Sequence, residues 1–187
     1  MEELALHILD IAENSIDAGA TNLIIEVTEN KDKNLLQIVI EDNGKGMNAN
    51  QIEKAVDPFF TSRTTRNVGM GLSLLKQAAV AANGDMNIES AVDKGTKVRA
   101  NFQLDHIDLQ PIGNLTDTMI ALILRNPDMD IIFKYQKNGK QFILDTREIK
   151  KKIKGTAINS SPVIRFLKEF ITENLFLISK ENKNAAI

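Results

Sequence analysis

The sequence is poor in the residues on which several common kinds of site depend. It has no Cys, no Trp, one Tyr and two His among its 187 residues. Without Cys there are no disulfides and no thiolate metal sites, and two His argue against a histidine-based zinc centre. The scarcity of Trp and Tyr argues against a large aromatic platform for nucleic acid. Nucleic acid is therefore not indicated as a partner.

Long apolar runs are also absent. The most apolar segment, MIALIL at Met119–Leu124, is far shorter than the roughly 20 residues that span a bilayer. The N-terminus has two Glu and no basic region leading into an apolar stretch, so it does not resemble a secretory signal. We expect a cytoplasmic protein with no membrane partner.

Charge divides the chain into two parts. Residues 1–105 hold 10 Lys and Arg against 16 Asp and Glu, whereas residues 106–187 hold 13 against 9. The 43% hydrophobic content suits one domain of about 100 residues plus a smaller one. We predict two modules, residues 1–105 and 106–187. The basic second half could face an acidic partner, but an ordinary lysine-rich surface is the better explanation of so modest a charge.

Hydrophobic periodicity predicts helices and strands in both modules. In the first module, helices are expected over about 2–18 and 49–56, and a long third helix follows and ends at about 82. Strands are expected over 23–27, 35–42, 85–90 and 96–104. Gly19 suits the left-handed end of the first helix. Because helices and antiparallel strands alternate without regular βαβ spacing, the pattern predicts a two-layer α+β sandwich.

The second module begins after a predicted linker at residues 105–114. A helix is expected over 117–125, ending before Asn126-Pro127. Residues 130–145 predict a hairpin, because alternating apolar residues flank Asn138-Gly139. Asp145 and Glu148 suggest a capping box for the helix that follows. Residues 161–174 predict a last helix, before a frayed tail. The module is thus a small α+β unit with a β-hairpin.

One face of the first helix is polar. Asp10, Glu13, Asn14 and Asp17 recur at helical spacing and form a stripe. An amphipathic surface helix explains the stripe as a solvated face. The alternative is a site in which three carboxylates around one Asn hold a metal and a nucleophilic water. The stretch alone favours the solvated face.

Two glycine loops follow in the chain. DNGKGM, at residues 42–47, ends a strand, and its glycines allow a close approach of backbone to a ligand. NVGMGLSLL, at residues 67–75, opens a helix whose free N–H groups could bind phosphate. It matches neither a Walker A loop nor a Rossmann loop. Alone, the first could be a plain turn and the second a simple helix-capping loop.

The order of these segments is more informative than any one of them. A polar-striped helix with Asn14 is followed by DNGKGM, then DPFFTSR, then VGMGLSLL and then KGTKV. Over about residues 4–104 the chain resembles the GHKL superfamily of ATP-binding domains, which includes sensor histidine kinases, MutL-type mismatch-repair ATPases, type II topoisomerases and a heat-shock chaperone. AENSIDAGATNLIIEV is most similar to the mismatch-repair branch, and residues 57–102 are most similar to histidine kinases. The resemblance implies a Bergerat fold, ATP and Mg²⁺.

The resemblance also implies roles for individual residues. Asn14 would hold Mg²⁺, which suits a hard cation bridged to phosphates. Asp42 would accept a hydrogen bond from the adenine amino group, and Thr96 would support that end through its hydroxyl and a water. The other residues implied to bind nucleotide are Asp17, Gly44, Gly46, Met47, Thr64, Gly69, Met70, Gly71 and Leu72. No residue of the second module is selected to reach the γ-phosphate.

The first helix departs from the hydrolytic branches of the superfamily in one respect. Those branches place a Glu general base four residues before the metal-binding Asn, and here that position is Asp10, one methylene shorter. Since a base must lie within about 3 Å of the water it activates, hydrolysis would be slow or would need closure onto a partner. The expected function is a nucleotide-dependent switch or slow ATPase with a protein partner or self-association. The alternatives are a protein kinase acting on His or Ser/Thr of a separate partner, and a regulatory ATP-binding module without turnover.

Overall fold

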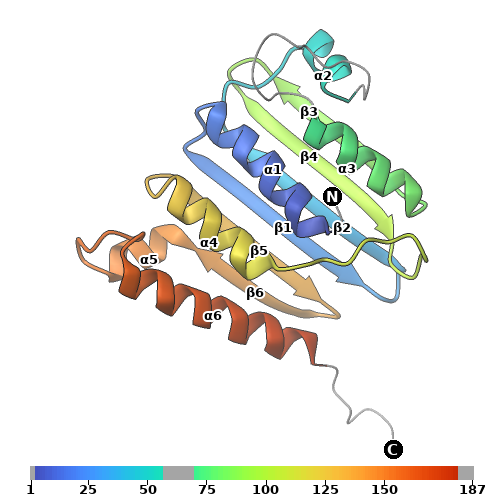
Figure 1. The fold of residues 1–187 in the computed structure, drawn as a ribbon. Coiled ribbons are helices and arrows are strands. Elements are labelled where there is room, and N and C mark those ends of the chain that lie inside the picture. The colour runs from blue at the N-terminus through green and yellow to red at the C-terminus, as the bar shows by residue number, and fades with distance from the viewer. Residues whose placement is uncertain (1–2, 57–69, 181–187) are drawn as a thin grey trace, which may run out of the picture.

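The computed structural model describes residues 3–56 and 70–180. In these ranges the chain forms a six-stranded sheet with the order β3-β4-β2-β1-β5-β6 (Figure 1). The strands are β1 (Asn22–Asn30), β2 (Leu35–Asp42), β3 (Asp85–Ala91), β4 (Gly95–Gln103), β5 (Asp130–Lys137) and β6 (Lys140–Asp145). Neighbouring strands are antiparallel except for β1 and β5, which are parallel.

The helices form a second layer. They are α1 (Leu4–Asp17), α2 (Ala49–Val56), α3 (Met70–Ala81), α4 (Leu115–Arg125), α5 (Thr146–Lys152) and α6 (Ser161–Ser179). Figure 1 shows α1, α3, α4 and α6 on the same face of the sheet. The predicted two-layer α+β sandwich is therefore confirmed. Among the described residues, none of the helices has both the length and the apolar character needed to cross a membrane.

The alternation of side chains along each strand explains the two layers. In β1, Leu23, Ile25 and Val27 are buried beneath the helices, and the residues between them lie on the other face. That other face carries cross-strand ion pairs, such as Lys97 with Glu41 at 2.8 Å and Lys134 with Glu26 at 2.6 Å. A sheet with one apolar and one charged face needs helices on one side only.

The segment after residue 105 extends the same sheet. β5 pairs with β1 so that Leu23 lies beside Ile131 and Ile25 beside Phe133. The β5–β6 hairpin turns at Asn138-Gly139, whose φ angles of +48° and +81° suit the predicted type I′ turn. Buried residues of both halves belong to one hydrophobic cluster. The predicted boundary at residue 105 lies between β4 and α4, and the division into two modules stays a prediction.

Most helix and strand boundaries agree with the sequence patterns to within two residues, but two elements run further than predicted. β1 continues to Asn30 and not to Val27. The last helix continues to Ser179 and not to Asn174, because Ile178 keeps the apolar spacing and is buried. The predicted capping box is also wrong. Asp145 does cap α5, accepting a hydrogen bond from the Arg147 N–H at 2.9 Å. Glu148 pairs with Lys151 at 2.8 Å, one turn along the helix, because that cation is close in sequence.

Candidate functional site

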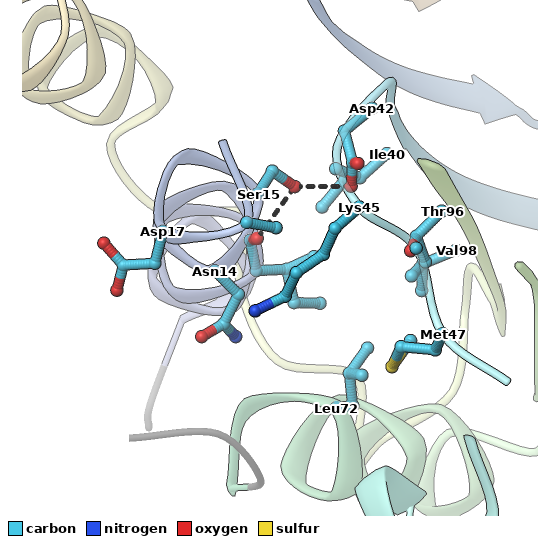
Figure 2. Close-up of a pocket in the computed structure, with 13 residues that line it drawn as sticks. Asn14, Ser15, Asp17, Ile40, Asp42, Lys45, Met47, Leu72, Thr96 and Val98 are labelled. Atoms are coloured by element: carbon cyan, nitrogen blue, oxygen red, sulfur yellow. Dashed lines mark hydrogen bonds between the residues drawn. The ribbon is translucent and has the colours of Figure 1, made fainter. Parts of the chain in front are cut away.

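A pocket of about 290 Å³ lies where the C-terminal half of α1 meets the end of β2, the start of β4 and the start of α3 (Figure 2). This is close to the lower end of the roughly 300–1,000 Å³ that small-molecule sites occupy. It is lined by Ile11, Asn14, Ser15, Asp17, Ala18, Ile40, Asp42, Lys45, Gly46, Met47, Leu72, Thr96 and Val98. Segments far apart in the sequence thus contribute to one cavity.

Apolar side chains form much of the pocket wall. Ile11, Ile40 and Val98 are at most 4% exposed, and Met47 and Leu72 project from the opposite side (Figure 2). The strand residues come from the buried face of β2 and β4, and Ile11 comes from the apolar face of α1. A slot between aliphatic side chains can bury a flat ring, and this binding is favourable because apolar surface of the ring and of the slot is removed from water.

Asp42 stands at the end of β2 with its carboxylate fixed by two donors. The Ser15 hydroxyl donates to Oδ2 at 2.8 Å, and the Gly44 N–H donates to Oδ1 at 2.8 Å. Ser15 is 3% exposed and its hydroxyl also lies 3.3 Å from the Ile11 carbonyl oxygen. Since a carboxylate offers about four lone-pair sites, Asp42 can still accept a hydrogen bond from a ligand. The wall is therefore apolar with one oriented acceptor.

The loop after Asp42 is held tightly against its neighbours. Gly46 has φ +62°, and a Cβ at this position would lie 1.9 Å from the Ala91 carbonyl oxygen. No residue with a side chain fits there without movement of the backbone. The Met47 N–H donates to the Ser90 hydroxyl at 2.8 Å, and Ser90 Oγ lies 2.9 Å from Thr96 Oγ1. This network sets the position of the Thr96 hydroxyl in the pocket wall.

The polar stripe of α1 is divided between different surroundings. Asn14 is half-buried and its amide points into the pocket, whereas the Asp17 carboxylate at the rim points away from the centre (Figure 2). Arg125 of α4 donates to Asp17 Oδ1 at 3.2 Å and lies 3.7 Å from a Glu13 carboxylate oxygen. Within the stripe, Asn14 thus faces the pocket, whereas the Glu13 and Asp17 carboxylates are partly exposed and pair with α4.

Asp10 lies outside the pocket wall, against the start of α3. A Cβ on Gly71 would fall 1.9 Å from Asp10 Oδ2, so the carboxylate occupies the space that a side chain at position 71 would need. The carboxylate therefore packs at the N-terminal turn of a helix, where the helix dipole favours negative charge. This contact explains why residue 71 is a glycine although α3 is helical there.

His7, one turn before Asp10, is buried in the body of the protein. It is 1% exposed, and its Nε2 lies 3.0 Å from the Gln110 side-chain oxygen, an acceptor that requires Nε2 to carry the proton. Burial lowers the pKa of His7 below its ordinary value, and the hydrogen bond to Gln110 partly opposes that change. His7 is a neutral core residue and lies outside the pocket wall.

The donor set of the pocket suits a magnesium ion that is held mainly by a ligand. No group of three or more His, Asp or Glu side chains in residues 3–56 and 70–180 is arranged to hold a metal. The Asn14 amide oxygen is a hard ligand that faces the cavity. Mg²⁺ commonly binds through one or two protein oxygens together with substrate phosphates and water. The residues present therefore fit a phosphate-bound Mg²⁺ and do not fit an ion caged by protein.

The structure brings together a majority of the residues that the sequence nominated. Asn14, Asp17, Asp42, Gly46, Met47, Leu72 and Thr96 line the pocket. Gly44 donates to Asp42 without lining the pocket itself, and Gly71 packs on Asp10. Met70 begins α3, and Thr64 and Gly69 fall outside the described residues, as does the rest of the segment 57–69.

Sequence reasoning missed two polar residues of the site. Ser15 was hidden because it falls on the buried side of α1, but its place directly after Asn14 was a usable signal. Lys45 was not singled out in the sequence, although its place between two glycines fixes where its side chain starts. The aliphatic wall residues carry no signal beyond ordinary core periodicity.

Comparison with known proteins agrees with this geometry. The sequence model of the family described as histidine kinase-, DNA gyrase B- and HSP90-like ATPases matches residues 2–106, more than half of the chain. The chain belongs to this family of ATPases, the GHKL superfamily. The match ends close to the predicted boundary between the modules.

Individual relatives are sensor proteins. A putative sensor protein of Shewanella frigidimarina is 30% identical over 109 residues, which are 57% of this chain and 17% of that protein. A putative sensor histidine kinase, NtrY-like, of Rickettsia conorii is 27% identical over 110 residues, which are 59% of this chain and 18% of that protein. The chain spans less than a fifth of the length of either relative.

A solved structure resembles the fold beyond the family match. The crystal structure of the N-terminal domain of a DNA repair protein aligns with a TM-score of 0.54 and 16% identity, over 78% of this chain and 53% of that one. At this identity the likeness concerns the fold alone.

Proposed function

We propose that the chain binds ATP together with Mg²⁺ in this pocket, and that it acts as a nucleotide-dependent switch or slow ATPase. The observation that carries the proposal is the arrangement of Asp42 and Asn14. A fixed carboxylate acceptor lies on one side of an apolar slot, and an amide oxygen faces the same cavity from α1 (Figure 2). These are the groups that an adenine amine and a phosphate-bound cation need.

The adenine would lie in the aliphatic slot. Its amino group would donate to Asp42, which Ser15 and Gly44 hold in place. Thr96 would support the ring through a water, since its hydroxyl faces the pocket from β4. Gly46 and Met47 would shape the entrance. Base recognition in this proposal depends on one charged acceptor, whose loss leaves a buried ligand donor unpaired.

The phosphates would lie toward Asn14. Asn14 would hold the Mg²⁺, which supplies charge neutralisation to the phosphate chain when bound. Leu72 lies in the pocket wall at the first turn of α3, and Thr64, Gly69, Met70 and Gly71 would complete the lid on the phosphates. Asp10 would serve as general base for slow hydrolysis, from its place beside Gly71.

Arg125 supports a switch. It belongs to α4, outside the family match, and it pairs with Asp17 and Glu13 on the helix that carries Asn14. A charged ligand arriving beside Asp17 changes the field that this ion pair experiences. Exposed ion pairs contribute about 0–1 kcal/mol each, and couplings between sites are typically about 1–3 kcal/mol. The contact is thus strong enough to transmit part of such a coupling.

The sensor histidine kinase relatives favour one other function. A chain of this kind could transfer the γ-phosphate to His or Ser/Thr of a separate protein. A regulatory module that holds ATP without turnover is the remaining alternative. In each case we propose a cytoplasmic protein that acts on a protein partner or on a second copy of itself.

Calorimetry with Asn14→Ala tests the binding site. We expect wild-type chain to bind ATP with Mg²⁺, and Asn14→Ala to lose the part of the affinity that depends on Mg²⁺. The matched control is Asn159→Ala, an exposed Asn in the loop before α6, which should bind as wild type does. Equal affinity of Asn14→Ala and wild type would contradict the assignment of the metal ligand.

Turnover separates the functional alternatives. We expect slow phosphate release from ATP that Asp10→Asn lowers further while ATP binding persists. Unchanged release in Asp10→Asn would exclude Asp10 as the base. Transfer of labelled γ-phosphate to a protein in lysate would favour the kinase. Binding without release or transfer would favour the regulatory module.

A further inference from the structure

Lys45 is the only residue with a side chain in the segment Gly44-Lys45-Gly46, and hydrogen bonds hold its backbone on two sides. The Lys45 N–H donates to the Ala18 carbonyl at the end of α1, at 3.1 Å. The Lys45 carbonyl accepts from the Asp93 N–H of the β3–β4 turn, at 2.8 Å. The close packing of Gly46 against Ala91 holds the same loop. The origin of the Lys45 side chain is therefore set by the fold.

From that origin the side chain crosses the mouth of the pocket. Figure 2 shows the Lys45 amine directed toward the Asn14 amide. Lys45 contributes to the pocket wall although the residue as a whole is exposed. In the part of the chain that the structure describes, its ammonium group makes no ion pair and no side-chain hydrogen bond with protein. An ammonium group has three donors, which here are left for solvent or a ligand.

The charges around the pocket make this amine distinctive. The other charged residues of the wall are the carboxylates Asp17 and Asp42, and in the described ranges Lys45 is the only cation that lines the cavity. Asp42 is engaged by Ser15 and Gly44, and Asp17 is paired with Arg125 on the side away from the pocket centre. A polyanionic ligand beside Asn14 would otherwise meet a wall whose net charge is negative.

We infer that Lys45 is a phosphate-binding residue, whose ammonium group donates to non-bridging oxygens of the nucleotide's phosphate chain on the side facing Asn14. The inference rests on the proposed binding of ATP, and it adds a specificity determinant between nucleotides and nucleosides. Lysine acts on phosphate as a flexible point charge, so its reach allows contact with more than one oxygen. The charge-assisted bond is stronger than one between neutral groups.

Calorimetry with Lys45→Met tests the inference across a series of ligands. Adenosine, AMP, ADP and ATP are titrated in the presence of Mg²⁺ into the full chain. We expect ADP and ATP to bind about tenfold more weakly to Lys45→Met, which is about 1.4 kcal/mol, and adenosine to change by less than about twofold. Lys45→Arg should keep most of the affinity, because it keeps the charge. Raising the salt concentration should narrow the difference between wild type and Lys45→Met for ADP and ATP.

The matched control is Lys33→Met, which removes the same charge from the exposed β1–β2 turn, outside the pocket wall. A loss of ADP affinity in Lys33→Met equal to that in Lys45→Met would overturn a local contact in favour of a general charge effect. Wild-type affinity of Lys45→Met for ADP and ATP would overturn the inference and leave the proposed function standing. An equal loss for adenosine would also overturn it, since Lys45 would then only shape the pocket. If wild type binds none of the four ligands, the proposed function fails first.

Discussion

Phe133 offers a direct test of whether the segments that form the pocket and the β5–β6 hairpin unfold together. Its side chain is fully buried and lies beside Ile25 across the parallel β1–β5 pair. The Phe142 ring packs edge-on against it, with 6.3 Å between the two ring centroids. Truncating a buried Phe to Ala typically costs about 3–5 kcal/mol. For a chain of this size, about 2–4 °C of melting temperature accompanies each kcal/mol. We therefore expect Phe133→Ala to melt about 6–20 °C below wild type.

The assay is thermal unfolding by far-ultraviolet circular dichroism, together with hydrogen exchange of the β2 and β4 amides. If both halves unfold together, the variant shows one transition, and exchange in β2 and β4 accelerates with that in β5. Ile143→Ala is the control, because Ile143 is 48% exposed on β6 and its truncation should cost less than about 1 kcal/mol. Two thermal transitions, of which only one shifts in the variant, would refute the view that both halves unfold together. So would unchanged protection of β2 and β4.

Two further predictions concern a glycine and a histidine. Gly46→Ala should lower the free energy of unfolding in urea by about 3 kcal/mol or more, because the new Cβ meets the Ala91 carbonyl and φ is +62°. Gly139→Ala has φ +81° but nothing within 4 Å, so about 1 kcal/mol is expected, and equal losses would contradict the steric explanation. Burial lowers the pKa of His7 below 6.5, so the unfolded chain binds the proton more readily and stability should fall as pH decreases through and below about 6.5. His7→Leu should reduce that slope in urea titrations at successive pH values, and an unchanged slope would exclude His7 as its source.

Local patterns in the sequence were sufficient for most of the helices and strands, whereas the candidate site was predicted from the order of several motifs and the family resemblance that this order carries. β2 has the predicted limits, because its apolar run is bounded by polar turns on both sides. Asn138-Gly139 predicted the hairpin because few other dipeptides adopt two left-handed conformations cheaply. Asn14 and Asp42, predicted from separate motifs, do line one pocket.

The unpredicted features depend on contacts between distant segments. Nothing in the strand pattern of residues 22–30 shows that residues 130–137 pair with it in parallel, because periodicity reports which face is buried and not which strand lies alongside. The contact of Arg125 with Glu13 and Asp17 depends on α4 lying beside α1. The support of Asp42 by Ser15 likewise appears only when α1 packs over the end of β2.

The parallel pairing of β1 with β5 has a consequence for how the chain folds during synthesis. β1 lies between β2 and β5, so one of its two edges keeps open backbone hydrogen-bonding groups until residues 130–137 have been made. Non-local pairings of this kind form slowly, and an open strand edge invites pairing with other chains. The part of the chain that matches the ATPase family would thus emerge with an unpaired strand edge, which the later hairpin covers. A chain truncated after residue 106 would keep that edge, and we expect it to aggregate.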